Sequence, residues 1–310
     1  MAKQKKSLIV TLADENYIKQ AKQLFSSVYF NAGWKGDYML LSHEIPEKDL
    51  KWFRKKGILI KKCKPLKKTD KRWATHIFLD KFYLFTPKFK KWNVIVYLDA
   101  DIIVRGSLNE LTKVNGFSAV RDINNNKISV NFEGDEEEIS KLNSIYCLNK
   151  EGFNAGVLAI NTRIIKKETF DDLIKLNKKY SKISAFGDQP ILNIYFQEII
   201  NFLPTRFNFY IPKSTSFIEK VIVLPKTKAN VLHFCGKNEK PWFKENHFYR
   251  EWVSNLEKAE LINLKETQKQ KMLNRNDICI SPYIIYLKLD NLIGKIGKIL
   301  RKLLNRLKLE

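Results

Sequence analysis

Short apolar runs separated by polar segments set the expected fold of the first part of the chain. Residues 7–13 (SLIVTLA) form an apolar, β-rich run, and Asp14–Asn16 can cap a helix over residues 17–30. Further elements are expected in the order strand, helix, strand, at residues 38–41, 46–56 and 58–62. Because strands that alternate with helices are typical of a parallel sheet, the pattern predicts an α/β fold.

The most regular apolar run is residues 94–98 (VIVYL), which reads as a strand buried on both faces of a sheet and ends at Asp99. A helix is expected before it, over residues 73–85. Residues 124–151 are polar, with an acidic cluster at 135–138, and we interpret them as an excursion over the active-site side. Later elements are expected as a strand at 157–160, helices at 170–179 and 190–197, and a last strand before His233.

Two acidic residues, Asp99 and Asp101, follow the strand at 94–98. Side chains two positions apart in an extended chain point to the same face, so the two carboxylates converge at the carboxyl end of a sheet strand. Open α/β sheets bind ligands there, and oxygen ligands suit Mg²⁺ or Mn²⁺. On spacing alone, two solvated loop aspartates or the aspartate pair of a haloacid dehalogenase-like phosphatase are the alternatives. Such phosphatases place the pair near the N-terminus, whereas here much of the sheet precedes it.

Three later segments combine glycine with side chains that can bind hydroxyls or phosphates: GFNAGVLAIN at 152–161, GDQPILN at 187–193 and HFCGKNEKPW at 233–242. Singly, each also has a structural interpretation. Asn154 could cap a turn, Asp188 could cap the helix that Pro190 begins, and His233 could be a buried structural histidine. The sequence contains neither Gly-x-Gly-x-x-Gly nor Gly-Lys-Ser/Thr, so dehydrogenase and kinase functions lose their main support.

Together with Asp99-Ala100-Asp101, and in this order, these segments resemble the family 8 glycosyltransferases. That family includes glycogenin and the bacterial lipooligosaccharide and lipopolysaccharide galactosyl- and glucosyltransferases. The resemblance covers roughly residues 7–245. It implies a GT-A type fold, in which helices flank a Rossmann-like, mostly parallel sheet, and it implies a UDP-hexose donor. It also implies Mn²⁺, with Mg²⁺ as the alternative, and retention of the anomeric configuration.

The resemblance further implies roles for individual residues. The metal ligands are Asp99, Asp101 and His233, and the catalytic contacts on the sugar side are Asn154, Asp188 and Gln189. The donor-binding residues are Thr11, Asp14, Asn16, Tyr17, Lys81, Ala100, Ala155, Gly236 and Lys240. Between Gly236 and Lys240 this sequence has three residues where the relatives have two, so Lys237 could share the phosphate contact. A metal and a lysine would stabilise the negative charge of the leaving diphosphate.

Composition adds one constraint. The chain has 56 Lys and Arg against 33 Asp and Glu, and its formal charge of +23 suggests an anionic partner. The four cysteines form no Cys-x-x-Cys pair, which favours a reducing compartment. The first residues are unlike a signal peptide, and no apolar stretch of about 18 residues could span a bilayer. We therefore expect a protein of the cytosol or of its membrane face.

Part of the positive charge lies in the last residues of the chain. On a helix, nine Leu and Ile residues from Leu289 to Leu307 fall on one face, and seven Lys and Arg residues from Lys288 to Lys308 fall on the other. Such a helix suits an anionic membrane surface, although its leucine face could instead pack on its own domain or on a second copy. Nucleic acid is not expected as a partner, because this stretch has no aromatic residues for base stacking.

We divide the chain into a catalytic domain (1–250), a helical extension (251–282) and a basic amphipathic helix (283–310). The expected protein is a retaining hexosyltransferase, cytoplasmic and peripheral on the inner face of the cytoplasmic membrane. It would move galactose or glucose from a UDP-sugar to a saccharide or glycolipid acceptor such as lipopolysaccharide or lipooligosaccharide. The alternatives are a glycogenin-like enzyme that glucosylates its own tyrosine, a metal-dependent phosphatase and a non-catalytic membrane-binding adaptor.

Overall fold

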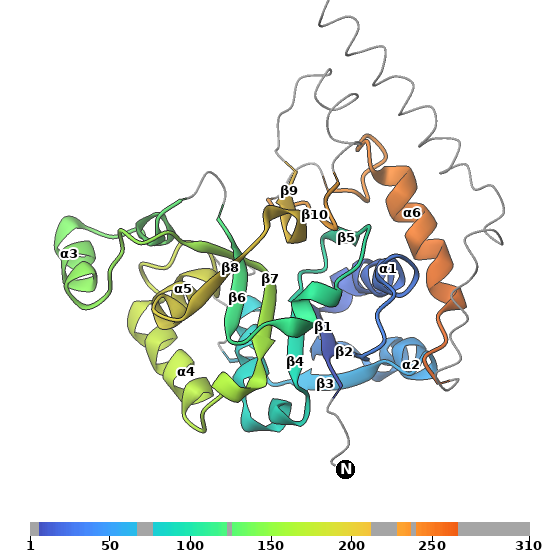
Figure 1. Cartoon of the computed structure of the whole chain (residues 1–310), viewed down its shortest axis with the longest axis horizontal. Coiled ribbons are helices and arrows are strands. Elements are labelled where there is room, and N and C mark those ends of the chain that lie inside the picture. Colours follow the sequence, from blue (N-terminus) through green and yellow to red (C-terminus); the bar gives the residue numbers. More distant parts are fainter. Residues whose placement is uncertain (1–5, 67–76, 123–125, 212–227, 237–239, 266–310) are drawn as a thin grey trace, which may run out of the picture.

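A computed structural model describes residues 6–66, 77–122, 126–211, 228–236 and 240–265, and its centre is a seven-stranded sheet (Figure 1). The strands lie in the order β3-β2-β1-β4-β7-β6-β8. Their bounds are β1 Leu8–Ala13, β2 Asp37–His43, β3 Leu59–Cys63, β4 Val94–Leu98, β6 Phe117–Arg121, β7 Phe153–Asn161 and β8 Ile200–Leu203. A second sheet, in the order β5-β10-β9, consists of β5 Ile102–Val104, β9 Phe209–Tyr210 and β10 Val231–His233.

Most neighbouring strands of the large sheet run parallel. The pairs β1–β2, β2–β3, β1–β4 and β6–β8 are parallel, whereas β7 runs antiparallel to both β4 and β6. This mixed but mostly parallel sheet confirms the predicted α/β class. The antiparallel β4–β7 pair sets the end of β4 beside the start of β7, and this places Asp99 and Asp101 near Asn154 and Ala155.

Helices cover both faces of the large sheet (Figure 1). One face carries α1 Ile18–Ser27 and α2 Glu47–Lys55, with α6 Tyr249–Lys258 packed against α1, and the other carries α4 Thr169–Tyr180 and α5 Gln189–Phe196. Helix α3, Glu136–Ile145, stands apart from the sheet. Short 3-10 helices span Glu15–Tyr17, Phe78–Phe85, Pro87–Lys91, Asn109–Lys113, Ile128–Asn131, Thr162–Ile164, Thr205–Phe207 and Ala259–Leu261, and a π-helical turn spans Val28–Ala32.

The side chains of each central strand alternate between two buried layers. In β4, Tyr97 joins the core beneath α4 and α5, whereas Val96 and Leu98 join the core beneath α1 and α2. Every residue of β1 and β4 is buried. Because both faces are covered, β4 is apolar throughout, as predicted for residues 94–98, and β1 is apolar except for Thr11.

Several elements differ from the sequence-based expectation. The helix expected over residues 73–85 is a 3-10 helix at Phe78–Phe85, and its first part lies outside the described residues. The helix expected over 17–30 is divided into a 3-10 turn, α1 and a π-helical turn. Strands β5, β6, β8 and β9 were not predicted, since none of them is a continuous apolar run as long as β4.

The last described part of the chain packs on the catalytic body. Helix α6 lies on α1, and Glu251 of α6 makes a two-pronged ion pair with Arg105, at 2.8 and 2.5 Å, just beyond β5. The predicted basic helix at 283–310 lies outside the described residues, so the boundaries proposed after residue 250 stay predictions. Among the described residues, no helix combines the length and the apolar character that crossing a bilayer requires.

Candidate active site

Three strands bring Asp99, Asp101 and His233 together. The two aspartates lie in the turn between β4 and β5, and His233 ends β10, which pairs antiparallel with β5 so that His233 lies opposite Ile102. The Nε2 atom of His233 lies 3.3 Å from Oδ1 of Asp101 and 3.8 Å from Oδ2 of Asp99. One ligand atom from each residue lies within 4.8 Å of the other two. This donor set of two carboxylates and one imidazole fits a divalent cation such as Mn²⁺ or Mg²⁺.

Each carboxylate uses its second oxygen for contacts within the protein. Oδ1 of Asp99 accepts a hydrogen bond from the hydroxyl of Tyr97 at 2.7 Å and lies 3.6 Å from Nζ of Lys81. Oδ2 of Asp101 accepts a hydrogen bond from Nζ of Lys240 at 2.5 Å. Each aspartate is therefore held by one oxygen and turns the other toward His233.

Neighbouring charges set the protonation of this cluster. Burial raises the pKa of Asp101, but His233 and Lys240 outweigh it and hold that pKa below its usual value. Burial lowers the pKa of His233, but Cys235 and Asp101 beside the ring raise it well above its usual value. Because only an unprotonated ring nitrogen is a metal ligand, a metal ion and a proton would compete for the same nitrogen of His233.

Lys81 lies between the carboxylates of Asp99 and Asp188. It is buried in the 3-10 helix at Phe78–Phe85, its Nζ lies 2.8 Å from Oδ2 of Asp188, and it donates to the carbonyl of Ala155 at 2.9 Å. Burial raises the pKa of Asp188 to about 6, although Lys81 acts in the opposite direction. Asp188 makes no capping hydrogen bond to α5, so its carboxylate serves this ion pair instead.

Gln189, the first residue of α5, makes hydrogen bonds with both ends of its amide. Its Oε1 accepts from the backbone N–H of Ala155 at 3.0 Å and from Nδ2 of Asn154 at 3.3 Å. Its Nε2 donates to Asn131 at 2.9 Å and to Asp122 at 3.2 Å. Gln189 thereby joins the start of β7 to Asp122, which follows β6, and to Asn131 in the polar segment 124–151.

The predicted nucleoside-binding segment spans the second half of β1 and the short helix after it. Thr11 is fully buried within β1, and its hydroxyl has no hydrogen-bond partner among the described residues. Asp14 accepts hydrogen bonds from the backbone N–H groups of Asn16 at 3.0 Å and Tyr17 at 3.1 Å, and so caps the short helix. The ring of Tyr17 meets the edge of Trp242 at a centroid distance of 5.9 Å. This pair puts an aromatic surface next to the Lys240 and Asp101 cluster.

The remaining predicted donor contacts lie around the same cluster. Ala100 is buried between the two aspartates, and Lys240 also donates to the carbonyl of Phe234 at 2.6 Å. Gly236 has a φ of +90°, a backbone conformation that favours glycine. Lys237 lies outside the described residues, so its share of a phosphate contact stays a prediction.

The site also contains residues that the sequence did not single out. Tyr97 lies on β4, two positions before Asp99, so the alternation of side chains in an extended chain could have indicated it. Asp122 follows β6, but Ser118 and the exposed Arg121 interrupt the apolar character of that strand, so no run like the one before Asp99 indicated it. Asn208 and Asn131 occur in segments without any repeated pattern, and only the folded chain brings them to Asn154 and Gln189.

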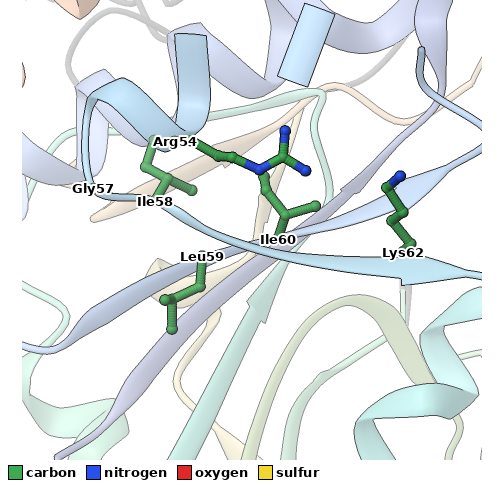
Figure 2. A pocket seen from close by; sticks show the side chains of 6 residues that line it. All are labelled: Arg54, Gly57, Ile58, Leu59, Ile60 and Lys62. Carbon is green, nitrogen blue, oxygen red and sulfur yellow. The ribbon is translucent and has the colours of Figure 1, made fainter. Parts of the chain in front are cut away.

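A cavity of about 530 Å³ lies elsewhere, along the edge strand β3 (Figure 2). It is lined by Arg54, Gly57, Ile58, Leu59, Ile60 and Lys62. None of the residues predicted for the site lines it, and Arg54 is occupied by an ion pair with Glu47 at 2.6 Å. The candidate site therefore lies at the β4, β7 and β10 ends and not in this cavity.

The fold is that of the GT-A glycosyltransferases. The chain is similar to a solved structure of the galactosyltransferase LgtC in complex with donor and acceptor sugar analogues, with a TM-score of 0.61 and 21% identity over 86% of this chain and 98% of that one. The model of the family "Glycosyl transferase family 8" matches residues 8–246. The chain belongs to this family.

Curated relatives match over part of their length. A putative glycosyltransferase of Haemophilus influenzae is 29% identical over 176 residues, which cover 55% of this chain and 50% of the relative. The glycosyltransferase GlyB of Streptococcus pneumoniae is 31% identical over 191 residues, which cover 56% of this chain and 41% of the relative. The match to these relatives thus spans half of their length or less.

Proposed function

We propose that this chain is a retaining hexosyltransferase that takes galactose or glucose from a UDP-sugar with the help of Mn²⁺. The observation that carries the proposal is the meeting of Asp99, Asp101 and His233 within 4.8 Å, with Lys240 against Asp101, in a chain of family 8. Family membership also favours transfer over the hydrolysis of a simple phosphate ester. Mg²⁺ is the alternative cation, because the same donor set suits it.

On the donor side, the three ligand residues would hold the cation between the strand ends and the diphosphate. A bound divalent cation supplies positive charge that stabilises the diphosphate as it leaves. Lys240 adds a second positive charge at the same place. Burial lowers the pKa of its ammonium group, but the hydrogen-bonded carboxylate of Asp101 outweighs burial and holds that pKa above its usual value. Thr11, Asp14, Asn16 and Tyr17 would hold the nucleoside.

On the sugar side, Asp188, Gln189 and Asn154 would surround the reacting carbon. The Asp188 carboxylate, held by Lys81, can stabilise the cationic transition state. Gln189 uses both ends of its amide to hold Asn154 and the backbone of Ala155. Its contribution would therefore be to fix the positions of groups around the sugar.

We further propose that the acceptor is a saccharide or glycolipid such as lipopolysaccharide or lipooligosaccharide, met at the inner face of the cytoplasmic membrane. Two observations support this. The similar structure of LgtC holds an acceptor sugar analogue, and residues 283–310 carry the alternation of leucine and basic residues that suits an anionic membrane surface.

The decisive experiment measures UDP release across a panel of UDP-sugars with Mn²⁺, using the parent protein and the variants Asp99→Asn and Asp101→Asn. We expect both variants to lose turnover and to bind Mn²⁺ and UDP more weakly. Asp171→Asn, an exposed aspartate of α4, is the matched control and should behave like the parent. Near-normal turnover of either site variant in limiting Mn²⁺ would refute the metal assignment.

The same samples distinguish the other functions. An increase in the intact mass of the protein by whole hexoses, without added acceptor, would indicate a glycogenin-like enzyme that glucosylates itself. Release of inorganic phosphate from simple esters would indicate a phosphatase. Vesicle binding without any binding of UDP or Mn²⁺ would indicate an adaptor.

A further inference from the structure

Two backbone N–H groups determine the orientation of side-chain amides in the site. The N–H of Gly156 donates to Oδ1 of Asn154 at 3.0 Å, and the N–H of Ala155 donates to Oε1 of Gln189 at 3.0 Å. A backbone N–H can only donate, so the atom that faces it must be the amide oxygen. The orientation of Asn154 is fixed twice, because its Nδ2 also donates to that same Oε1 of Gln189 at 3.3 Å.

This orientation is passed on to Asn208 and then to His233. Oδ1 of Asn154 accepts a hydrogen bond from Nδ2 of Asn208 at 2.9 Å. The oxygen of Asn208 consequently faces the opposite way and lies 2.8 Å from Nδ1 of His233. Because that oxygen can only accept, Nδ1 must carry a hydrogen. The other ring nitrogen, Nε2, faces Asp99 and Asp101.

We propose that Asn208 is a positioning residue, which keeps a proton on Nδ1 of His233 and so presents Nε2 to the divalent cation. The inference rests on the proposed function only in naming a divalent cation as the ligand. Hydrogen bonds from the second ring nitrogen of a metal-binding histidine fix its tautomer and its ring orientation. Asn208 makes that contact here, although it lies outside every motif of the sequence.

The backbone holds Asn208 firmly in this place. Strand β9 begins directly after it and pairs parallel with β10, with Tyr210 in register with His233. The side chain is 6% exposed, so water does not replace its hydrogen bonds. The alternative partner of the ring is Cys235, whose Sγ lies 3.2 Å from Nδ1 and 3.1 Å from Nε2, but sulfur is a weak acceptor.

The ring cannot easily turn to exchange its nitrogens. A Cβ atom on Gly156 would lie 2.1 Å from Cε1 of His233, so the imidazole packs directly against the glycine backbone. Gly156 thus contributes twice, by the N–H that orients Asn154 and by the space that admits the ring.

The first test measures binding of Mn²⁺ in the presence of UDP, by the electron paramagnetic resonance signal of the free ion. Asn208→Leu keeps the approximate volume and removes the acceptor, and we expect it to bind Mn²⁺ about 10- to 100-fold more weakly. Asn161→Leu is the matched control. Asn161 is 7% exposed, makes two side-chain hydrogen bonds, and lies at the other end of β7, so it should leave Mn²⁺ binding unchanged.

Asn208→Asp is the conservative variant that separates positioning from packing. It keeps an oxygen toward Nδ1 and should regain most of the Mn²⁺ affinity. Its second oxygen faces Oδ1 of Asn154, so turnover should fall while metal binding persists. The proposal would be overturned if Asn208→Leu bound Mn²⁺ as tightly as the parent. It would also be overturned if Asn208→Asp bound Mn²⁺ no more tightly than Asn208→Leu.

A second measurement uses the unaltered protein and does not depend on turnover. Nitrogen NMR of protein labelled at histidine, with Mg²⁺ and UDP, reports which ring nitrogen of His233 carries the proton, and the spectrum of His233→Gln assigns its signals. A proton on Nδ1 supports the proposal, and a proton on Nε2 overturns it. If no UDP-sugar is turned over, the proposed function fails, but the proton position still decides this inference.

Discussion

At the residue scale, Lys81 shares one positive charge between two carboxylates that serve different parts of the site. Its Nζ lies 2.8 Å from Asp188 and 3.6 Å from Asp99. Burial lowers the pKa of Lys81, but the two aspartates outweigh it and raise that pKa above its usual value. The ammonium group therefore stays charged, and a cation bound beside Asp99 would compete with it for negative charge.

The pKa of Asp188 predicts how turnover depends on pH. Burial raises this pKa to about 6, so the carboxylate is protonated below that pH and ionised above it. If the ionised form stabilises the cationic transition state, kcat should fall as the pH drops through about 6. Asp188→Asn should have a much lower kcat without this acidic limb, which can be measured between about pH 5 and about pH 8. A kcat of the parent that is constant over that range would contradict the assignment.

Protonation of Asp188 in acid should lower turnover without unfolding the protein. Its pKa is higher in the folded state than the value of about 3.9 expected for the unfolded chain. The contribution of this group to stability is therefore greatest below about pH 4 and is lost as the pH rises through about 6. A thermal melt at each pH is the control, and unfolding that coincides with the acidic limb would show a different cause.

Gly156→Ala should disrupt the metal site without removing a charged group. The new Cβ would lie 2.1 Å from Cε1 of His233, so the ring must move away from Asp99 and Asp101. We expect a loss of stability of about 1 to 3 kcal/mol and Mn²⁺ binding weakened at least about tenfold. Gly33→Ala is the control, because Gly33 has a φ of +62° and no atom within 4 Å of the added Cβ. Gly33→Ala should lower stability but leave Mn²⁺ binding unchanged. Unchanged Mn²⁺ binding in Gly156→Ala would contradict the prediction.

At the element scale, a largely buried ion pair links α6 to the end of β5, in addition to the packing of α6 on α1. Arg105 holds Glu251 through two nitrogens, and both side chains are largely buried. Removing one partner leaves the other charge partly buried and unpaired. Glu251→Ala should therefore lower the free energy of unfolding by about 2 kcal/mol, as measured by urea denaturation.

The exposed pair of Arg121 and Glu151 provides the control for this prediction. Both side chains are almost half exposed, so Glu151→Ala should have little effect. Equal losses of unfolding free energy in Glu251→Ala and Glu151→Ala would show that burial of the Arg105–Glu251 pair does not add to its contribution.

The strands differ in how clearly the sequence predicted them. Residues 94–98 were predicted with the bounds that β4 has, because a run buried on both faces is continuously apolar. Strand β9 has two residues and no pattern, yet it brings Asn208 to His233. Motifs therefore indicated the groups of the candidate site that are close in sequence. The residues that orient them come from short strands and turns, whose pairing depends on the whole fold.

At the scale of the whole molecule, the basic helix predicted at 283–310 should separate membrane binding from turnover. The residues of the candidate site all precede it, so removing 283–310 should leave an enzyme that uses a soluble acceptor but no longer binds anionic vesicles. Binding by the intact chain should weaken with salt, because each basic residue near the surface contributes about 1 kcal/mol. Co-sedimentation with vesicles at low and high salt measures this.

Two outcomes would contradict the membrane prediction. Equal sedimentation of the intact and truncated proteins would mean that another surface binds the vesicles. Unfolding of the truncated protein would mean that the leucine face packs on the catalytic body instead.

The polar excursion has a consequence for how such a protein can diversify. Its ends are tied side by side, since Lys127 pairs with Glu151 in an antiparallel bridge, and Asn131 near its start holds Gln189. Beyond Asn131 the chain leads out to α3, which stands apart from the sheet (Figure 1). Lengthening a loop whose ends are already joined adds little entropic cost. Helix α3, which contacts the core through the buried Leu142, is thus a part of the described chain whose length could change while the residues at the strand ends stay as they are.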